Sequence, residues 1–297
     1  MKLLGTLMII VVFLSGCMYV SGTSESEPSM KLSAIDVGQG LAVLLEWEGR
    51  YAMYDFGPDS VGVVDSLERR GVDTLEWVLL SHYHRDHIGG FMELVGCGVF
   101  VRRLLVGTDE SCNYICDSVY RVARRLKIPV DTVRRGESLR FVEKALAGVT
   151  GAASGASVGI ESPQFDVLWP TKYVHVEGNG ASVVLLVRYG AARALLTGDL
   201  DSLGERRLLE MNPTLSAELL QVAHHGSAGS NTLQFLSQVS PKYAIVSVGA
   251  GNGYGHPTKS VVRKLNLVLG DSTKLFRTDL QGSIMFEVYS DMGAVEP

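Results

Sequence analysis

The sequence predicts a mixed α/β fold in which two β-sheets pack face to face and helices cover their outer surfaces. Apolar runs of strand length alternate with helical segments in both halves of the chain, and several of these runs end in a histidine or an aspartate. The 33 glycines are typical of a protein with many turns. A chain of 297 residues suits one domain of this kind, because sandwich folds often reach about 250 residues. We expect the domain over residues 31–290.

The first half of the domain begins with a predicted β-hairpin. Two apolar runs flank Gly49-Arg50, a turn signal. Val64 and Leu67 then have helical spacing, and the unbroken apolar run at 77–80 indicates a buried strand. The expected strands are 31–37, 41–47, 51–55, 77–80 and 99–106, and the expected helices are 61–70, one that starts at 90–95, and the amphipathic segment 111–126.

The second half continues the alternation without a repeat of fixed period. Residues 145–159 are rich in Ala, Gly and Ser, which indicates a surface insertion and not a domain boundary. A strand pair or bulge is expected within 131–142. The remaining strands are expected at 165–169, 182–189, 191–197, 219–223, 243–248, 275–277 and 282–289, and the helices at 205–211, 231–239 and 260–269.

The N-terminus has the pattern of a secretory signal. Lys2 precedes the apolar run 3–14, and Leu14-Ser15-Gly16-Cys17 resembles a lipobox, in which cleavage leaves Cys17 as a lipid-modified first residue. We therefore expect a signal peptide at 1–17 and a polar tether at 18–30. An uncleaved membrane anchor and plain secretion are the alternatives. All three place the domain outside the cytoplasm, and the lipid would make the membrane a partner.

Charge and cysteine content restrict the function classes less sharply. The net charge of −5 argues against a broad basic face for nucleic acid, although bound cations would reverse the local field. Cys97, Cys112 and Cys116 remain in the domain. Cys112 and Cys116 are expected on one face of a helix, a poor geometry for a bridge. Buried free thiols are as good an interpretation as any disulfide.

A cluster of metal-ligand side chains follows the strand at 77–80. His82, His84, Asp86 and His87 lie within six positions, and they include three of the seven histidines in the chain. His82 and His84 can serve one ion, and Asp86 and His87 can serve a second ion nearby. Two divalent ions about 3.5–4 Å apart activate water and polarise a phosphoryl or carbonyl oxygen. The alternative, scattered surface histidines, does not explain this density.

Other strand ends provide what the cluster lacks. The Asp199 carboxylate is suited to bridge two ions, although a Gly-Asp turn is the alternative, and His225 is placed to complete the second ion's ligands. A buried core histidine is the alternative for His225. Asp55 and the neighbouring His224 are expected behind the ligands, where Asp55 would orient an imidazole. As a bare residue, Asp55 is equally often a helix or turn cap.

The order of these motifs resembles the metallo-β-lactamase superfamily, and within it the extracytoplasmic domain of the DNA-internalisation competence proteins of the ComEC family. The similarity runs from about residue 31 to 288. It is carried by Asp36-Val37-Gly38-Gln39-Gly40, Tyr54-Asp55-Phe56-Gly57, the run 82–90, Asn179-Gly180-Ala181-Ser182, Leu196-Thr197-Gly198-Asp199, His224-His225-Gly226-Ser227, Asn252-Gly253-Tyr254-Gly255-His256-Pro257 and Arg277-Thr278-Asp279.

The resemblance implies a four-layer αββα sandwich with the metal site at one edge of the sheets. It implies that site one consists of His82, His84 and Asp199, and that site two consists of Asp86, His87, Asp199 and His225. Many relatives have another histidine before the strand at 182–189, where this chain has Asn179 and, four residues earlier, His175. Either residue, or water, would complete site one. The mixed nitrogen and oxygen ligands favour Zn²⁺ first and Mn²⁺ second.

The resemblance also has two departures. The competence proteins usually have an acidic residue where this chain has Leu41. They also carry a many-helix membrane channel, which this sequence does not have, so we expect only the hydrolase part.

The expected function is a lipid-anchored, two-metal phosphodiesterase and, within that class, a nuclease acting on DNA. A metal-bound hydroxide held near Asp86 and Asp199 would attack phosphorus in line. His256 would bind the phosphate or protonate the leaving oxygen, and the expected substrate contacts are Ser227, Ser230 and Asn252. Turn chemistry alone is the alternative for the two serines.

Two other functions fit the same motifs. One is a phosphodiesterase of small or envelope substrates, similar to phosphorylcholine esterases, which the acidic charge favours slightly. The other is a non-catalytic surface binding protein on the same fold, which the intact ligand positions disfavour. No protein partner follows from the sequence.

Overall fold

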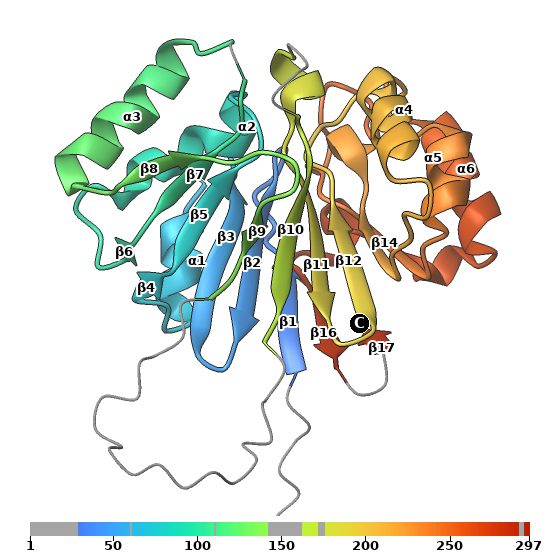
Figure 1. Cartoon of the computed structure of the whole chain (residues 1–297), viewed down its shortest axis with the longest axis horizontal. Helices are drawn as coiled ribbons and strands as arrows, with labels where there is room; N and C mark the ends of the chain where they lie inside the picture. The colour runs from blue at the N-terminus through green and yellow to red at the C-terminus, as the bar shows by residue number, and fades with distance from the viewer. Residues whose placement is uncertain (1–28, 60, 110, 142–161, 172–175, 291–293) are drawn as a thin grey trace, which may run out of the picture.

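The structure, a computed structural model, describes residues 29–59, 61–109, 111–141, 162–171, 176–290 and 294–297. Within them, two large β-sheets face each other and helices lie outside both (Figure 1). The predicted two-sheet sandwich with outer helices is therefore confirmed. The signal segment with Cys17, the insertion at 145–159 and His175 lie outside the described residues.

The first sheet has the order β17-β16-β1-β2-β3-β5-β7-β8. Its strands are β1 (Ser29–Ala34), β2 (Ala42–Trp47), β3 (Arg50–Phe56), β5 (Trp77–Leu80), β7 (Leu104–Val106), β8 (Val130–Thr132), β16 (Ile284–Tyr289) and β17 (Ala294–Glu296). The second sheet has the order β15-β14-β13-β12-β11-β10-β9. Its strands are β9 (Ser138–Leu139), β10 (Gln164–Trp169), β11 (Val184–Tyr189), β12 (Ala192–Leu196), β13 (Leu219–Gln221), β14 (Tyr243–Val246) and β15 (Leu275–Arg277). A small separate pair joins β4 (Thr74–Leu75) and β6 (Phe100–Val101).

Helices cover the outer face of each sheet (Figure 1). The α-helices are α1 (Val63–Arg69), α2 (Arg85–Ile88), α3 (Tyr114–Leu126), α4 (Ser202–Met211), α5 (Leu233–Val239), α6 (Lys259–Leu269) and α7 (Thr278–Gln281). Short 3₁₀ turns are η1 (Gly89–Leu94), η2 (Gly178–Ala181), η3 (Ala223–Gly226) and η4 (Ser272–Lys274). Among the described residues, no helix is both long and apolar enough to cross a bilayer.

Three separate apolar cores hold the four layers together. Side chains alternate between the two faces of a strand, so Val43 of β2 packs into the core between the sheets while Leu44 faces the outer core with Leu67 of α1. The third core lies between the second sheet and its helices, and includes Leu208 of α4 and Phe235 of α5. Burial on both faces explains why several strands read as unbroken apolar runs.

Several predicted elements differ from the observed ones. The strand expected at 99–106 is divided, because β6 pairs with β4 while β7 joins the first sheet. The strands expected to pair within 131–142 belong instead to opposite sheets, as β8 and β9. The helix expected from residue 111 begins at Tyr114, because the Asn113 side chain accepts hydrogen bonds from the backbone N–H groups of Ile115 and Cys116 and caps it. Strand β1 begins at Ser29, before the predicted start of the domain at residue 31. Strand β17 ends at Glu296, after the predicted end at residue 290.

Candidate metal centre

The candidate site is built at the carboxyl ends of four strands. β3 pairs in parallel with β5, and β12 pairs in parallel with β13, so the ends of each pair meet at one edge of its sheet. Asp55 is at the end of β3, His82 follows β5, Asp199 follows β12 and His225 follows β13. The sandwich brings these two edges together, although the two pairs lie more than 100 positions apart in sequence.

The side chains form two groups of metal-ligand atoms. His82, His84 and Asp199 form one group and Asp86, His87 and His225 form the other, with the ligand atoms of each group within 4.8 Å of one another. The structure thus brings the sequence-predicted ligands together. The first group is the set implied for site one, and the second is the set implied for site two without Asp199.

The Asp199 carboxylate faces both groups, one oxygen to each. Its Oδ2 lies 3.9 Å from His82 Nε2. Its Oδ1 lies 3.1 Å from His87 Nε2 and 3.6 Å from His225 Nε2. A carboxylate in this position can link a cation held by the first group to a cation held by the second.

The inward-facing atoms lack hydrogen-bond partners. Nε2 of His82, His87 and His225 and Oδ1 of Asp199 are all buried without a partner among the described residues. Buried polar atoms in native proteins are nearly always satisfied. Neutral imidazole nitrogens and carboxylate oxygens around one point are the donors that divalent metals take. The residues present therefore fit divalent metal ions.

The opposite ring nitrogens are held by neighbouring groups. His87 Nδ1 donates to Asp55 Oδ2 at 2.7 Å, and His225 Nδ1 donates to the carbonyl oxygen of Ser247 at 2.8 Å. His82 Nδ1 lies 3.0 Å from Ser81 Oγ. A proton fixed on Nδ1 leaves the Nε2 lone pair free for a metal. Asp55 thus occupies the orienting position expected from the sequence.

The charges of the site favour a cation. Burial opposes the charge of Asp199, but His87 and His225 outweigh it and hold the pKa of Asp199 well below its usual range. Burial opposes the charge of His87 too, but Asp199 and Asp55 raise its pKa well above the usual value. Burial, assisted by His87, lowers the pKa of His82 and keeps that ring neutral. The carboxylates thus draw positive charge to this point, and a metal ion would compete with protons for it.

His224 and Asn179 form a second layer beside Asp199. His224 Nε2 lies 3.7 Å from Asp199 Oδ2, and the Asn179 side-chain amide lies 3.1 Å from His224 Nδ1. Asn179 therefore contacts His224, while its own Oδ1 is buried without a partner. The neighbouring Gly178 lies next to the His84 ring, since a Cβ on this glycine would be 3.6 Å from His84 Nε2.

The end of the Asp36–Gly40 motif and the adjacent Leu41 support the backbone around the site. Leu41 N–H donates to the carbonyl oxygen of Asp86 at 3.0 Å, and Ser247 Oγ donates to the carbonyl oxygen of Gly40 at 2.8 Å. Ser247 also accepts from His225, so one segment supports ligands of both groups. The Leu41 side chain lies in the core between the sheets, which gives this position a packing role.

Two further braces were not predicted. The buried Glu205 carboxylate of α4 accepts the backbone N–H groups of Asn231 and, at 2.9 Å, Thr232. The Asn231 side chain in turn accepts from Ala223 N–H at 3.1 Å and donates to its carbonyl oxygen at 2.9 Å. This holds the backbone two residues before His225. The one signal of this brace in the sequence is the acidic residue Glu205 in the first turn of α4.

The predicted substrate residues differ in how free their side chains are. The Asn252 amide donates to the carbonyl oxygens of Gly249 and His256 and accepts from the N–H groups of Tyr254 and His256, so it shapes its own loop. Ser227 Oγ accepts from Gly229 N–H at 3.3 Å. Ser230 Oγ is buried without a partner among the described residues.

His256 lies next to the pair formed by His224 and Asn179. Its ring centroid is 5.7 Å from that of His224. Burial, His224 and His225 together lower the pKa of His256. Gly226 makes this approach possible, because a Cβ on it would lie 2.4 Å from Cβ of Pro257.

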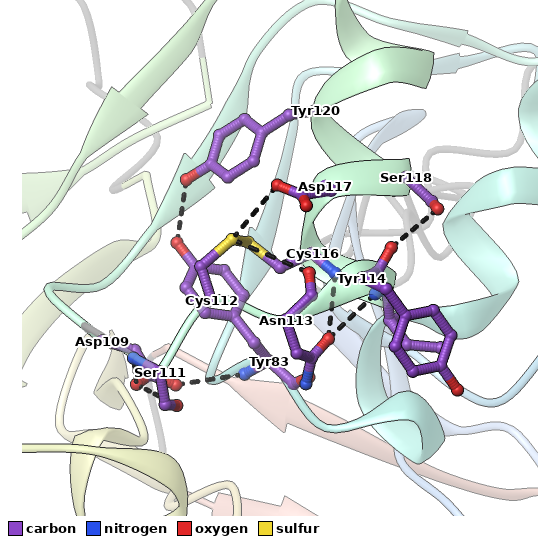
Figure 2. The surroundings of a disulfide bond; sticks show 11 residues. Tyr83, Asp109, Ser111, Cys112, Asn113, Tyr114, Cys116, Asp117, Ser118 and Tyr120 are labelled. Atoms are coloured by element: carbon purple, nitrogen blue, oxygen red, sulfur yellow. Dashed lines mark hydrogen bonds between the residues drawn. A yellow bond between two sulfur atoms is a disulfide. The ribbon is translucent and has the colours of Figure 1, made fainter.

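A disulfide joins Cys112 to Cys116, the pair for which the sequence indicated a poor geometry while leaving the disulfide state open (Figure 2). The expected helix geometry does not apply, because Cys112 precedes the Asn113 cap and lies outside the helix. The Cα atoms are 5.4 Å apart, within the range for a bridge. Cys97 remains a free thiol.

The segment before the bridge contacts the histidine loop. The largely buried Asp109 accepts from Tyr83 N–H at 3.3 Å and from Ser111 N–H at 2.9 Å (Figure 2). It also accepts from Gly178 N–H at 3.3 Å. Asn113 Nδ2 donates to the carbonyl oxygen of Tyr83 at 3.3 Å. The backbone between His82 and His84 is therefore held by the start of α3, another support that the sequence did not reveal.

Comparison with known proteins decides the family, since the sequence profile described as the metallo-beta-lactamase superfamily matches residues 35–250. The chain belongs to the metallo-β-lactamase superfamily. Members of this superfamily are generally metal-dependent hydrolases, which agrees with the ligand groups above.

Curated relatives support the predicted branch. Competence protein ComA of Neisseria gonorrhoeae is 33% identical over 282 residues, covering 93% of this chain and 35% of that protein. ComE operon protein 3 of Bacillus subtilis is 30% identical over 260 residues, covering 87% of this chain and 30% of that protein. These relatives are competence proteins of the ComEC type, and the chain spans about a third of their length.

A solved structure supports the fold. The metallo-beta-lactamase fold protein YhfI from Bacillus subtilis superposes with a TM-score of 0.54 at 14% sequence identity, covering 87% of this chain and 99% of that one. At this identity the likeness establishes the fold alone.

Proposed function

We propose that this protein is a two-metal phosphodiesterase that cleaves DNA outside the cytoplasm. The observation that carries the proposal is the Asp199 carboxylate, whose two oxygens face two separate ligand groups. The competence proteins among its relatives support nucleic acid as the substrate class. The ligand chemistry favours Zn²⁺, with Mn²⁺ as the alternative.

The chain's own residues divide the work. Divalent ions in this arrangement would lower the pKa of a water molecule and polarise a phosphoryl oxygen. Asp55, Ser247 and Ser81 keep the ligand rings oriented. His256, whose ring contacts that of His224, is the residue assigned to contact the phosphate. Its lowered pKa leaves it neutral at neutral pH and able to donate one hydrogen bond.

The location is proposed from the N-terminal sequence alone. The Leu14–Cys17 segment supports cleavage and lipid attachment at Cys17. Cys17→Ser should leave the precursor uncleaved or release the protein from membranes. A wild-type protein that is unmodified and membrane-free contradicts the anchor without affecting the proposed chemistry.

The function is tested with purified protein, metal-stripped and then supplied with zinc or manganese. We expect metal-dependent cleavage of single-stranded or duplex DNA, and of bis-p-nitrophenyl phosphate. His84→Ala should abolish cleavage and lower the metal content while the fold remains, because the His84 side chain is exposed and removing it opens no core cavity. Full activity in His84→Ala or in the stripped protein contradicts the proposal. Activity on small phosphodiesters without DNA cleavage would instead assign a small or envelope substrate.

A further inference from the structure

Tyr254 presents an aromatic ring to solvent on the loop that carries His256. Its side chain is 72% exposed, although burying a tyrosine is normally favourable. The loop beneath it is not free to collapse, because the Asn252 amide accepts from Tyr254 N–H at 3.2 Å and donates to the carbonyl oxygens of Gly249 and His256. The ring is therefore held outward by the backbone.

This ring is stacked on a residue that leads to the metal ligands. The Tyr254 and His256 rings lie 5.8 Å apart with an interplanar angle of 23°. The His256 ring contacts His224 edge to face at 5.7 Å, and His224 Nε2 lies 3.7 Å from Asp199 Oδ2. Tyr254 is thus the outermost ring in a line of contacts that runs through His256 and His224 to the Asp199 carboxylate.

We propose that Tyr254 is the stacking platform for a base of single-stranded nucleic acid whose phosphate lies at the metal centre. This rests on the proposed function and adds how the substrate is held. An exposed, pre-oriented ring beside the site of phosphate cleavage matches the way sequence-tolerant proteins hold unpaired bases. The preference for single strands follows, because the faces of paired bases are already stacked in a duplex.

The test compares Tyr254→Ala with Tyr254→Phe, which keeps the ring. Binding is measured by fluorescence anisotropy in the presence of a chelator, and KM and kcat are measured with metal. The substrates are a single-stranded oligonucleotide and an oligonucleotide of the same length with abasic sites. Phe100→Ala is the control, since this aromatic ring is also exposed, at 55%, but lies on β6 in the separate β4–β6 pair.

Tyr254→Ala should weaken binding and raise KM for the base-bearing strand about 5- to 150-fold, as expected for about 1–3 kcal/mol per stacked base. The kcat, the metal content and the kinetics on the abasic strand should stay unchanged, and Tyr254→Phe and Phe100→Ala should behave as wild type. Equal loss on both strands, or no loss in Tyr254→Ala, overturns the platform while the nuclease function stands. A wild-type protein that cleaves no nucleic acid overturns both.

Discussion

Replacing Asp55 by Asn should weaken metal binding without disrupting the fold. Asp55 Oδ1 accepts from Ser81 N–H at 2.6 Å, and its Oδ2 accepts from Ser81 Oγ and His87 Nδ1, each at 2.7 Å. Asparagine has the same shape but only one acceptor oxygen. The backbone φ of Asp55 is 58°, a left-handed conformation that asparagine also tolerates, so the change tests the side-chain chemistry alone.

Both orientations of the new amide are unfavourable. If its NH₂ replaces Oδ2, it meets the His87 Nδ1 proton, and relief requires that proton to move to Nε2, which then loses the lone pair aimed at the metal. If its NH₂ replaces Oδ1, it meets Ser81 N–H, and a buried donor is left unpaired at a cost of about 1–3 kcal/mol. Losing such an orienting partner typically costs about 10- to 100-fold in metal affinity, or about 1.4–2.8 kcal/mol at 1.4 kcal/mol per tenfold change.

The assay is zinc affinity by competition with a chromophoric chelator, with the free energy of unfolding measured on the stripped protein. Asp59→Asn is the control, because the Asp59 carboxylate accepts two hydrogen bonds from Arg85, at 2.7 and 2.6 Å, and orients no ligand ring. Unchanged affinity in Asp55→Asn, or an equal loss in Asp59→Asn, would refute the orienting role of Asp55.

Further predictions concern the brace formed by Glu205 and Asn231 and the loop that carries His256. Glu205→Gln should lower the free energy of unfolding by about 1–3 kcal/mol, because its NH₂ group would face the backbone N–H of Asn231 or Thr232. Denaturant titration measures the free energy of unfolding. The control Glu210→Gln, in an exposed pair on the same helix, should change it by less than about 1 kcal/mol. Burial raises the pKa of Glu205 to about 7, so the folded state binds the proton more tightly than the unfolded state. The stability of the wild type should therefore fall, relative to that of Glu205→Gln, as pH rises toward 7. A stability difference between the two proteins that does not change over this pH range contradicts the shift. His256→Ala should cut turnover by about 10²–10⁴-fold at unchanged metal content, and loss of a metal ion would make His256 a ligand instead.

The sequence by itself determined the fold class and the candidate ligands. Alternating strand and helix patterns, with apolar runs of strand length, are local properties, and so is the density of His82, His84 and His87 within one loop. The hairpin of β2 and β3 was also predicted, although its turn is Glu48-Gly49, both with positive φ, and not Gly49-Arg50, because Arg50 already belongs to β3.

Tertiary structure decided how these parts meet. The division of Asp199 between two groups, the brace from Glu205 through Asn231, and the approach of His256 to His224 depend on distances between residues in different segments of the chain. The sequence left the Cys112–Cys116 bridge open and disfavoured its geometry, because that geometry depends on whether the helix begins before or after Cys112. Sequence patterns report the period of each segment, but such contacts arise only when the two sheets pack and bring their strand ends to one edge.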